Sequence, residues 1–218
     1  MNDVYTSDDL NIFRNPVRII IAGVTGSGKT QFTTSLVKKY GHIFKDIYVC
    51  GLTSHPLEND ENLNTKIILS KDICNPLDSF THPDPSNHTL LILDDVFNKA
   101  VSAESVSEAF TRGRHHLLSV ILITQNIFFP GKYSRNISLN ASHFVLFRIR
   151  DNNQVECLAR QCFGKNKARK VLEIYNHVIS QNPHAYLLVD LNLYTPPKLQ
   201  FRTNITASDA CEVVFINE

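Results

Sequence analysis

The feature that most constrains this chain is a glycine-rich segment that joins an apolar run to the start of a helix. The segment directly follows the apolar residues 17–22. Its residues are Gly23, Val24, Thr25, Gly26, Ser27, Gly28, Lys29 and Thr30. This order is the pattern G-x-x-x-x-G-K-[ST], a phosphate-binding P-loop, in the strand–loop–helix context that the pattern requires. A chance glycine-rich turn is the alternative, and the full match in the right context disfavours it.

The residue types in this segment suit a nucleoside triphosphate. Glycines let the backbone curl so that its N–H groups point toward phosphate oxygens, and the N-terminus of the following helix adds partial positive charge. Lys29 is predicted to reach the β and γ phosphates, and the Thr30 hydroxyl is predicted to bind Mg²⁺. We therefore expect all eight residues to form a nucleotide site.

Length and composition are those of one folded α/β domain. The chain has 218 residues, of which 43% are hydrophobic and 20% charged. No apolar run reaches the roughly 20 residues that a membrane span needs, and the acidic, polar start is unlike a signal peptide. There is no C-x-x-C pair, so we expect reduced thiols in an intracellular protein, without zinc or disulfides. The cysteines are Cys50, Cys74, Cys157, Cys162 and Cys211.

Apolar strands alternate with helices along most of the chain, which predicts a mostly parallel sheet with helices on both faces. Strands are expected at residues 17–22, 46–50, 66–69, 89–93, 119–124, 143–148 and 186–190. Helices are expected from the P-loop to about residue 40, at 102–111, at 152–162, and after Gly164. We expect a polar lead-in at 1–15, an ATPase domain at 16–197 that ends at the Pro196-Pro197 pair, and an extension at 198–218 with a candidate edge strand at 213–216.

The net charge of +1 conceals a strong polarity along the sequence. Residues 46–108 hold eleven acidic side chains and three lysines, a balance of −8. Residues 112–170 hold eleven lysines and arginines against two acidic side chains, a balance of +9. This basic half favours contact with a phosphate backbone, and the alternative is a set of solvated surfaces without a partner.

Polar residues follow two of the predicted buried strands. Asp94 and Asp95 come directly after residues 89–93, and Gln125 follows residues 119–124. Asp94 is predicted to hold Mg²⁺, usually through water, and Asp95 is the candidate base for the attacking water. The Gln125 amide is predicted to contact the γ-phosphate or that water, although a loop-capping role stays open.

Two arginines flank Gly113. Arg112 and Arg114 suit either the stabilisation of phosphate charge during transfer or the binding of a DNA phosphate, and Arg135 is a third candidate. The sequence leaves open which of them has which role. His115 and His116 are adjacent, which is poor spacing for metal ligands, so we predict no zinc site.

Four segments together resemble a known family. They are GVTGSGKT (23–30), LLILDDV (90–96), TRGRHHLLSVILITQN (111–126) and SRNISLNASHFVLFRIRD (134–151). Their order is similar to that in viral genome-packaging ATPases of the FtsK–HerA type. The resemblance is closest to the poxvirus-type packaging ATPases of large DNA viruses, virophages and Polinton or adintovirus elements, and it covers roughly residues 16–197.

The resemblance implies a P-loop NTPase fold of the ASCE (RecA/FtsK–HerA-like) type, in which the strand before Gln125 lies between the strands before Lys29 and Asp94. It implies ATP and Mg²⁺ as cofactors and a homo-oligomeric ring, a pentamer or hexamer, around double-stranded DNA. Lys29, Asp95 and Gln125 would be catalytic, with Arg112 or Arg114 supplied to a neighbouring subunit. Capsid or portal-region proteins would be partners. The protein would act inside the infected cell, in a viral factory, the nucleus or the cytoplasm, or in association with the virion.

The sequence therefore favours an ATP-hydrolysing translocase that packages viral or virus-like DNA into a capsid, without a membrane partner. Two other classes stay open. A small nucleotide kinase has a P-loop and a similar length, but leaves the Gln125 strand end and the Arg112–Arg114 unit unexplained. A non-motor ATP-binding regulator would hydrolyse ATP slowly, at a rate that DNA does not change.

Overall fold

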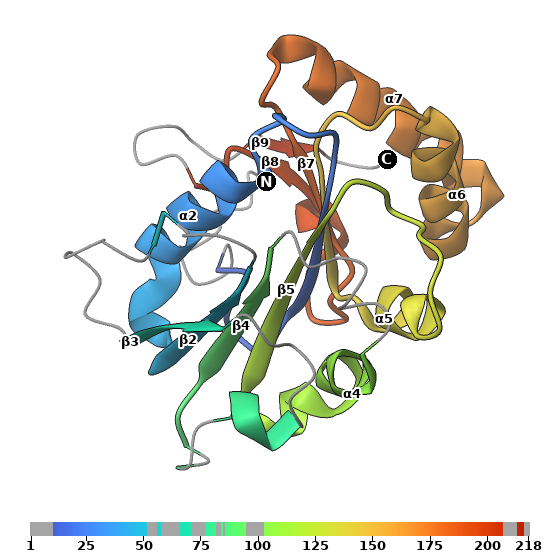
Figure 1. Ribbon diagram of the computed structural model, residues 1–218. Coiled ribbons are helices and arrows are strands. Elements are labelled where there is room, and N and C mark those ends of the chain that lie inside the picture. The colour runs from blue at the N-terminus through green and yellow to red at the C-terminus, as the bar shows by residue number, and fades with distance from the viewer. Residues whose placement is uncertain are drawn as a thin grey trace.

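The computed structural model describes residues 11–51, 56–57, 66–70, 77–81, 84, 86–94, 103–206 and 213–215 (Figure 1). Within this part of the chain, nine strands form one sheet in the order β3-β2-β4-β5-β1-β6-β7-β8-β9. The strands are β1 (Arg18–Ala22), β2 (Asp46–Cys50), β3 (Lys66–Ser70), β4 (Thr89–Leu93), β5 (Leu118–Thr124), β6 (His143–Leu146), β7 (Leu187–Asp190), β8 (Phe201–Thr203) and β9 (Val213–Phe215).

The strand pairing confirms the predicted sheet type. The pairs from β3 through β6 are all parallel, and β7, β8 and β9 are added antiparallel. β5 lies between β1 and β4, as the resemblance implied. The central strands are continuous apolar runs because both of their faces are covered, which is typical of parallel sheets.

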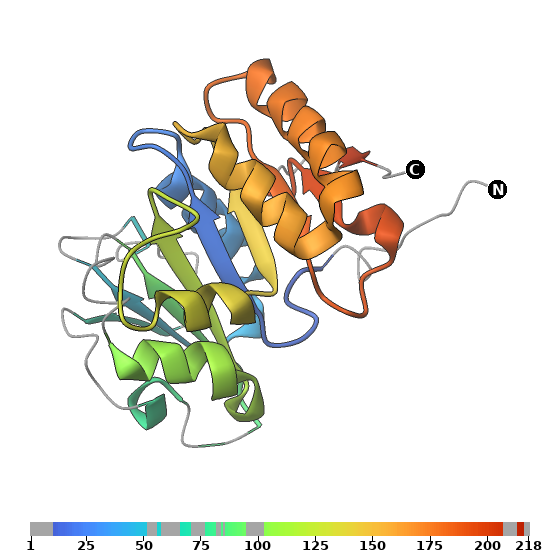
Figure 2. The same ribbon diagram turned by 90° about the vertical axis from the view of Figure 1, so that its right-hand side faces the viewer.

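Helices cover both faces of the sheet, as predicted. α2 (Lys29–Tyr40) lies on one face, and the other face carries α4 (Glu104–Arg112), α5 (Ser134–Asn140), α6 (Asn152–Phe163) and α7 (Lys165–Gln181) (Figures 1 and 2). Short 3-10 turns lie at Gly41–Ile43, Leu77–Phe80, Gly113–His116 and Pro197–Leu199. α5 is a helix that the sequence analysis did not predict.

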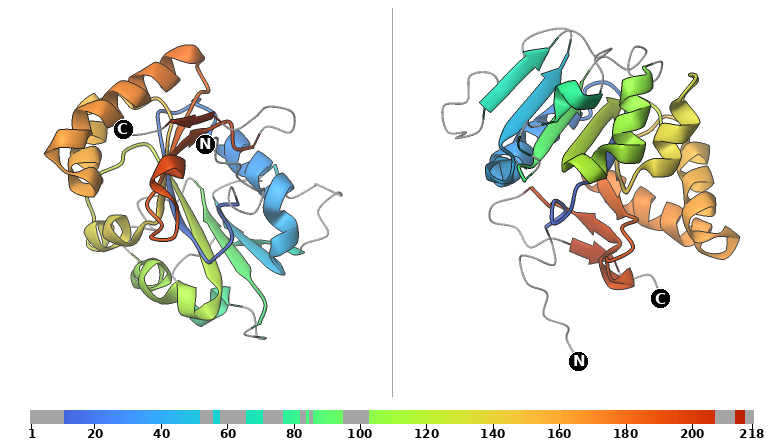
Figure 3. Two further views of the ribbon diagram at one scale, coloured as in Figure 1. Left: turned by 180° about the vertical axis from the view of Figure 1, so that it is seen from behind. Right: turned by 90° about the horizontal axis from the view of Figure 1, so that it is seen from below.

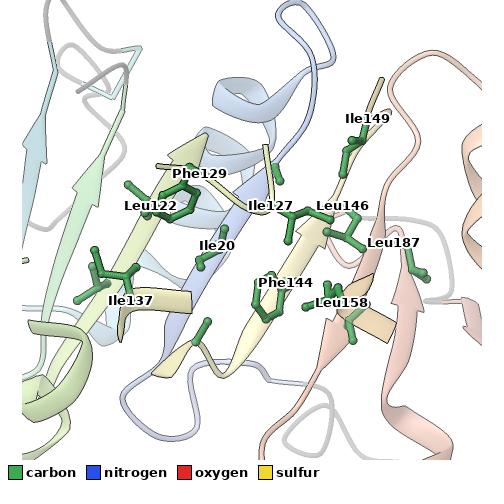
Figure 4. Packing of buried hydrophobic residues seen from close by; sticks show 14 of the residues in the cluster. Ile20, Leu122, Ile127, Phe129, Ile137, Phe144, Leu146, Ile149, Leu158 and Leu187 are labelled. Atoms are coloured by element: carbon green, nitrogen blue, oxygen red, sulfur yellow. The ribbon is translucent and has the colours of Figure 1, made fainter. Parts of the chain in front are cut away.

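Alternate side chains of β1 belong to two separate hydrophobic clusters. Ile20 packs in the cluster on the face of α4–α7, together with Leu122, Phe144 and Leu146 (Figure 4). Ile19 packs on the other face with residues of α2 such as Leu36. Each fully buried aliphatic or aromatic side chain contributes roughly 1.5–3 kcal/mol, so β1 is fixed from both sides.

Because β1, β4, β5 and β6 are parallel, the loops that follow them lie at one edge of the sheet, here called the carboxyl edge. The P-loop, Asp94 and Gln125 follow these strands directly, and Arg148 lies two residues after the end of β6. The residues that precede the same strands, including Gly113–His116 before β5, lie at the opposite, amino edge. This arrangement decides which predicted site residues can meet within one chain.

The sheet continues beyond Pro197, where the sequence placed the end of the compact part. β8 pairs with β7, and β9 pairs with β8 at the end of the strand order, where the candidate edge strand was expected (Figure 3). Arg202 on β8 and Asp190 on β7 are both buried, and their Nη2 and Oδ2 atoms are 2.9 Å apart. The proline pair marks a turn between strands, and the buried ion pair joins the segment after it to the domain.

Among the described cysteines, Cys50 is buried and Cys157 is exposed, and both are free thiols. Cys162 is also free, and burial raises the pKa of its thiol to about 11. Cys74 and Cys211 lie outside the described residues. Within the described part, no three His, Cys, Asp or Glu side chains are grouped to hold a metal, and no helix is long and apolar enough to span a membrane.

Candidate nucleotide-binding site

The P-loop turns sharply between β1 and α2. Gly26 and Gly28 have φ angles of 79° and 101°, a region that favours glycine, and Gly28 is the N-cap of α2. Gly23 has a different role, because a Cβ atom added there would lie 2.6 Å from the Cβ atom of Phe147. Glycine is therefore required at position 23 because the P-loop backbone lies close to Phe147, and at positions 26 and 28 because of their φ angles.

Two backbone hydrogen bonds fix the loop to strands that come much later in the sequence. The Gly23 N–H donates to the Thr124 carbonyl at 3.2 Å, and the Val24 N–H donates to the Arg148 carbonyl at 2.9 Å. The loop is thus held between the ends of β5 and β6. The residue after Thr124 is Gln125, which is exposed at this carboxyl edge.

Three predicted ligand residues meet at the base of the loop. The Lys29 ammonium group donates to the carbonyl oxygens of Gly23 at 2.8 Å and Val24 at 3.0 Å. The Thr30 hydroxyl donates to Oδ2 of Asp94 at 3.0 Å. Asp94 is 9% exposed, so this carboxylate is at the floor of the site and not on the open surface.

These groups fit a magnesium–nucleotide complex. A hydroxyl and a carboxylate are the hard oxygen ligands that Mg²⁺ prefers. The first turn of α2 carries no acidic residue, and no side chain caps its N-terminus, so its N–H groups and partial positive charge face the loop. A bound Mg²⁺ would neutralise phosphate charge, and Thr30 and Asp94 would hold it.

Not all of the predicted catalytic residues lie here. Asp95 lies outside the described residues. Arg112 and Arg114 are exposed at the amino edge, across the sheet from their own P-loop. Arg112 is 3.8 Å from Glu108 within α4. Burial lowers the pKa of the Arg18 guanidinium, and the charge of Arg114 lowers it further.

The exposed cations of the basic half lie on several separate parts of the fold. They are distributed over the amino edge, the carboxyl edge and the helices α6 and α7. On α6 and α7, Arg160 pairs with Glu156 and Arg169 pairs with Glu173, whereas Lys165 and Lys167 have no carboxylate partner in the described part of the chain. The charge count alone therefore overstated the free positive surface.

The structure places two further features at the carboxyl edge that the sequence analysis missed. Nδ1 of His184, in the connection between α7 and β7, lies 3.2 Å from the Ser27 carbonyl oxygen. A cleft of about 550 Å³ is lined by residues that include Val24, Arg148, Asn152 and Tyr175. The RIRD segment at 148–151 was a signal for the cleft, but nothing in the sequence signals His184, which is 157 residues from Ser27.

Comparisons with known proteins agree with this geometry. The sequence model of the family described as "Poxvirus A32 protein" matches residues 55–195, more than half of the chain. The DNA packaging protein OPG160 of Variola virus is 27% identical, over 93% of this chain and 79% of the relative. The Monkeypox virus protein of the same name is also 27% identical, over 93% of this chain and 71% of its own length.

A solved structure has the same fold. The genome packaging NTPase B204 from Sulfolobus turreted icosahedral virus 2, determined in complex with ATP-γS, matches with a TM-score of 0.56 and 18% identity. The match covers 81% of this chain and 93% of B204. At this identity the likeness shows the P-loop NTPase fold. The family model, which matches residues 55–195 and so more than half of the chain, shows that this chain belongs to the poxvirus A32 protein family.

Proposed function

We propose that this chain is an ATP-hydrolysing motor that moves viral double-stranded DNA into a capsid. The observation that carries the proposal is the contact of Thr30 with Asp94 beside Lys29 in a P-loop, in a chain whose relatives are named DNA packaging proteins. Capsid or portal-region proteins are the further partners, and the infected cell is the place of action.

The residues at the carboxyl edge divide the work in this proposal. Lys29 and the N-terminus of α2 bind the phosphates, and Thr30 and Asp94 hold Mg²⁺. Asp95 and Gln125 orient the attacking water. The position of Gln125 supports this role. It directly follows Thr124, the last residue of β5, whose carbonyl oxygen accepts a hydrogen bond from the Gly23 N–H of the P-loop.

The arginines at the amino edge serve a neighbouring subunit in this proposal. Neither can reach its own P-loop, because the whole length of β5 separates them from it. We assign the role to Arg114, because Arg112 is already paired with Glu108 on its helix. An arginine supplied in trans can stabilise the charge that develops during phosphoryl transfer, and such residues contribute about 10³–10⁵ in rate.

Mixing two inactive variants tests this assignment. Arg114→Ala and Lys29→Ala are each expected to lower the rate of ATP hydrolysis by at least about 10²-fold when pure. Mixed rings are expected to regain part of the activity, because some interfaces combine an intact P-loop with an intact arginine. Steady-state phosphate release at several mixing ratios measures this. If mixtures stay inactive while Arg112→Ala with Lys29→Ala recovers activity, the role belongs to Arg112 instead.

We expect this chain to bind DNA mainly through the negative charge of its phosphates. The exposed Lys165 and Lys167 on α7 are free of carboxylates among the described residues, and we propose that they bind the DNA backbone. Such contacts are indifferent to base sequence and weaken as salt displaces the protein from phosphates.

The test is ATP hydrolysis with and without double-stranded DNA across a salt series. We expect DNA to stimulate the wild-type protein, and the stimulation to fall with rising salt. The Lys165→Ala, Lys167→Ala double variant should show less stimulation and a shallower salt dependence, with the rate in the absence of DNA unchanged. Turnover that ignores DNA at low salt in a ring-forming preparation would contradict the motor and favour a regulator.

A further inference from the structure

His184 lies directly on the P-loop although it comes from the far end of the chain. Its Nδ1 atom is 3.2 Å from the Ser27 carbonyl oxygen and would be 3.3 Å from a Cβ atom added to Gly28. The residue is nevertheless exposed, so its ring covers the loop with one edge and faces solvent with the rest. The His184 backbone N–H donates to Asn182 Oδ1 at 2.8 Å, which holds the connection between α7 and β7 in place.

The strand order gives the direction in which a bound nucleotide must extend. Asp94 follows β4 and Gln125 follows β5, so the metal and the terminal phosphate belong on that side of β1. The nucleoside must then leave the P-loop on the opposite side, toward β6 and β7. The connection that contains His184 lies on that side, next to the P-loop at the carboxyl edge (Figures 1 and 2).

The chemistry of the ring suits a nucleoside. A carbonyl oxygen only accepts hydrogen bonds, so the contact with Ser27 places a proton on Nδ1. In the neutral ring Nε2 is then an acceptor, which can receive a hydrogen bond from a ribose hydroxyl or from an amino group of a base. The flat face of the imidazole can also stack on a base.

We propose that His184 contacts the nucleoside part of the bound nucleotide. This contact would make the site bind ATP more tightly than a triphosphate without a nucleoside. The inference rests on the proposed ATPase function. His184 lies outside the P-loop motif and outside the acidic and glutamine positions. It is a binding residue that the fold adds at the far end of the phosphate chain from Asp94.

The experiment compares magnesium–ATP with magnesium tripolyphosphate, which has the phosphates but no nucleoside. In His184→Ala we expect the KM and the Kd for ATP to rise about tenfold, because one stacked base is worth a change of this order. We expect kcat within about twofold of wild type and an unchanged affinity for tripolyphosphate, since Lys29, Thr30 and Asp94 are untouched. His184→Phe keeps a ring for stacking and should recover part of the loss. The matched control is His177→Ala, an exposed histidine of α7 outside the site.

The other outcomes overturn the inference in distinguishable ways. An equal loss of affinity for ATP and tripolyphosphate in His184→Ala would mean that His184 only shapes the P-loop through Ser27. If His184→Ala binds ATP and tripolyphosphate as tightly as wild type and hydrolyses ATP normally, His184 does not contact the nucleoside. The proposed function would be unaffected by that result. Wild-type protein that neither binds nor hydrolyses ATP would overturn the proposed function and this inference together. Thermal unfolding of each variant verifies that it is folded.

Discussion

Replacing Lys29 with alanine is expected to lower the rate of ATP hydrolysis by about 10²- to 10³-fold, the loss typical of removing one group that stabilises developing charge. The Lys29 ammonium lies inside the loop, 2.8 Å from the Gly23 carbonyl oxygen and 3.0 Å from that of Val24. No other lysine or arginine of the described P-loop or of the first turn of α2 can replace it. Phosphate release under steady-state conditions measures the effect.

The matched control for this change is Lys38→Ala, an exposed lysine in the last turn of the same helix. Its activity should stay within about twofold of wild type, since its ammonium group is at the far end of α2 from the nucleotide. Equal rates in Lys29→Ala and wild type, with both proteins folded, would show that hydrolysis occurs elsewhere or by a contaminant.

Removing the Asp190 carboxylate is expected to lower the free energy of unfolding by about 3–5 kcal/mol, the range for breaking a buried ion pair from one side. Asp190 Oδ1 is 3.2 Å from His143 Nε2, and its Oδ2 is 2.9 Å from Arg202 Nη2. Arg202 is 1% exposed, so Asp190→Ala removes the Asp190 carboxylate from a guanidinium group in the core. Domains are stable by only about 5–15 kcal/mol, so this is a large share.

Lowering the pH should weaken the same interaction of Asp190 with His143 and Arg202. Burial alone would raise the pKa of Asp190, but the hydrogen bond and charge of His143, the Asn192 N–H and the charge of Arg202 outweigh it and lower the pKa. A carboxyl pKa that is lower in the folded state gives stability that is present above the unfolded value of about 3.9 and is lost as the pH falls below it. Asp190→Ala should therefore lose less stability than wild type as the pH falls through this range.

Urea denaturation at several pH values measures both effects. The control is Glu173→Ala, which removes an exposed pair with Arg169 on α7 and should cost no more than about 0.5 kcal/mol. If Asp190→Ala is as stable as this control, the cluster of Asp190, His143 and Arg202 does not hold β8 to the sheet.

The sequence predicted the parallel part of this fold well because its central strands are largely apolar runs, most of them bounded by polar or glycine residues. For β2 and β4 the expected bounds agree with the structure, and β1 and β5 differ by one residue. The P-loop pattern is local, so its residues were identified directly. Thr30 and Asp94 were each predicted to bind Mg²⁺, and the structure brings them into contact because each follows a parallel strand that ends at the same edge.

The features that were missed depend on long-range contacts. α5 has seven residues and buries only Ile137, so its sequence shows no helical period. β8 has three residues, one of them an arginine, and its sequence alone does not indicate a buried strand. Arg202 can be buried there because it pairs with Asp190 on β7. His184 is placed on the P-loop by the antiparallel return of β7, a connection that no local pattern records.

The central place of β1 also has a consequence for the nascent chain on the ribosome. Among the described strands β1 is synthesised first, but its neighbours are β5 and β6, and Ser119 of β5, whose hydroxyl accepts from the Val17 N–H, comes 102 residues later. At about 5–20 residues per second, that interval lasts roughly 5–20 s. During this time the apolar run of β1 has neither flanking strand, so it is an exposed segment to which a chaperone can bind during translation.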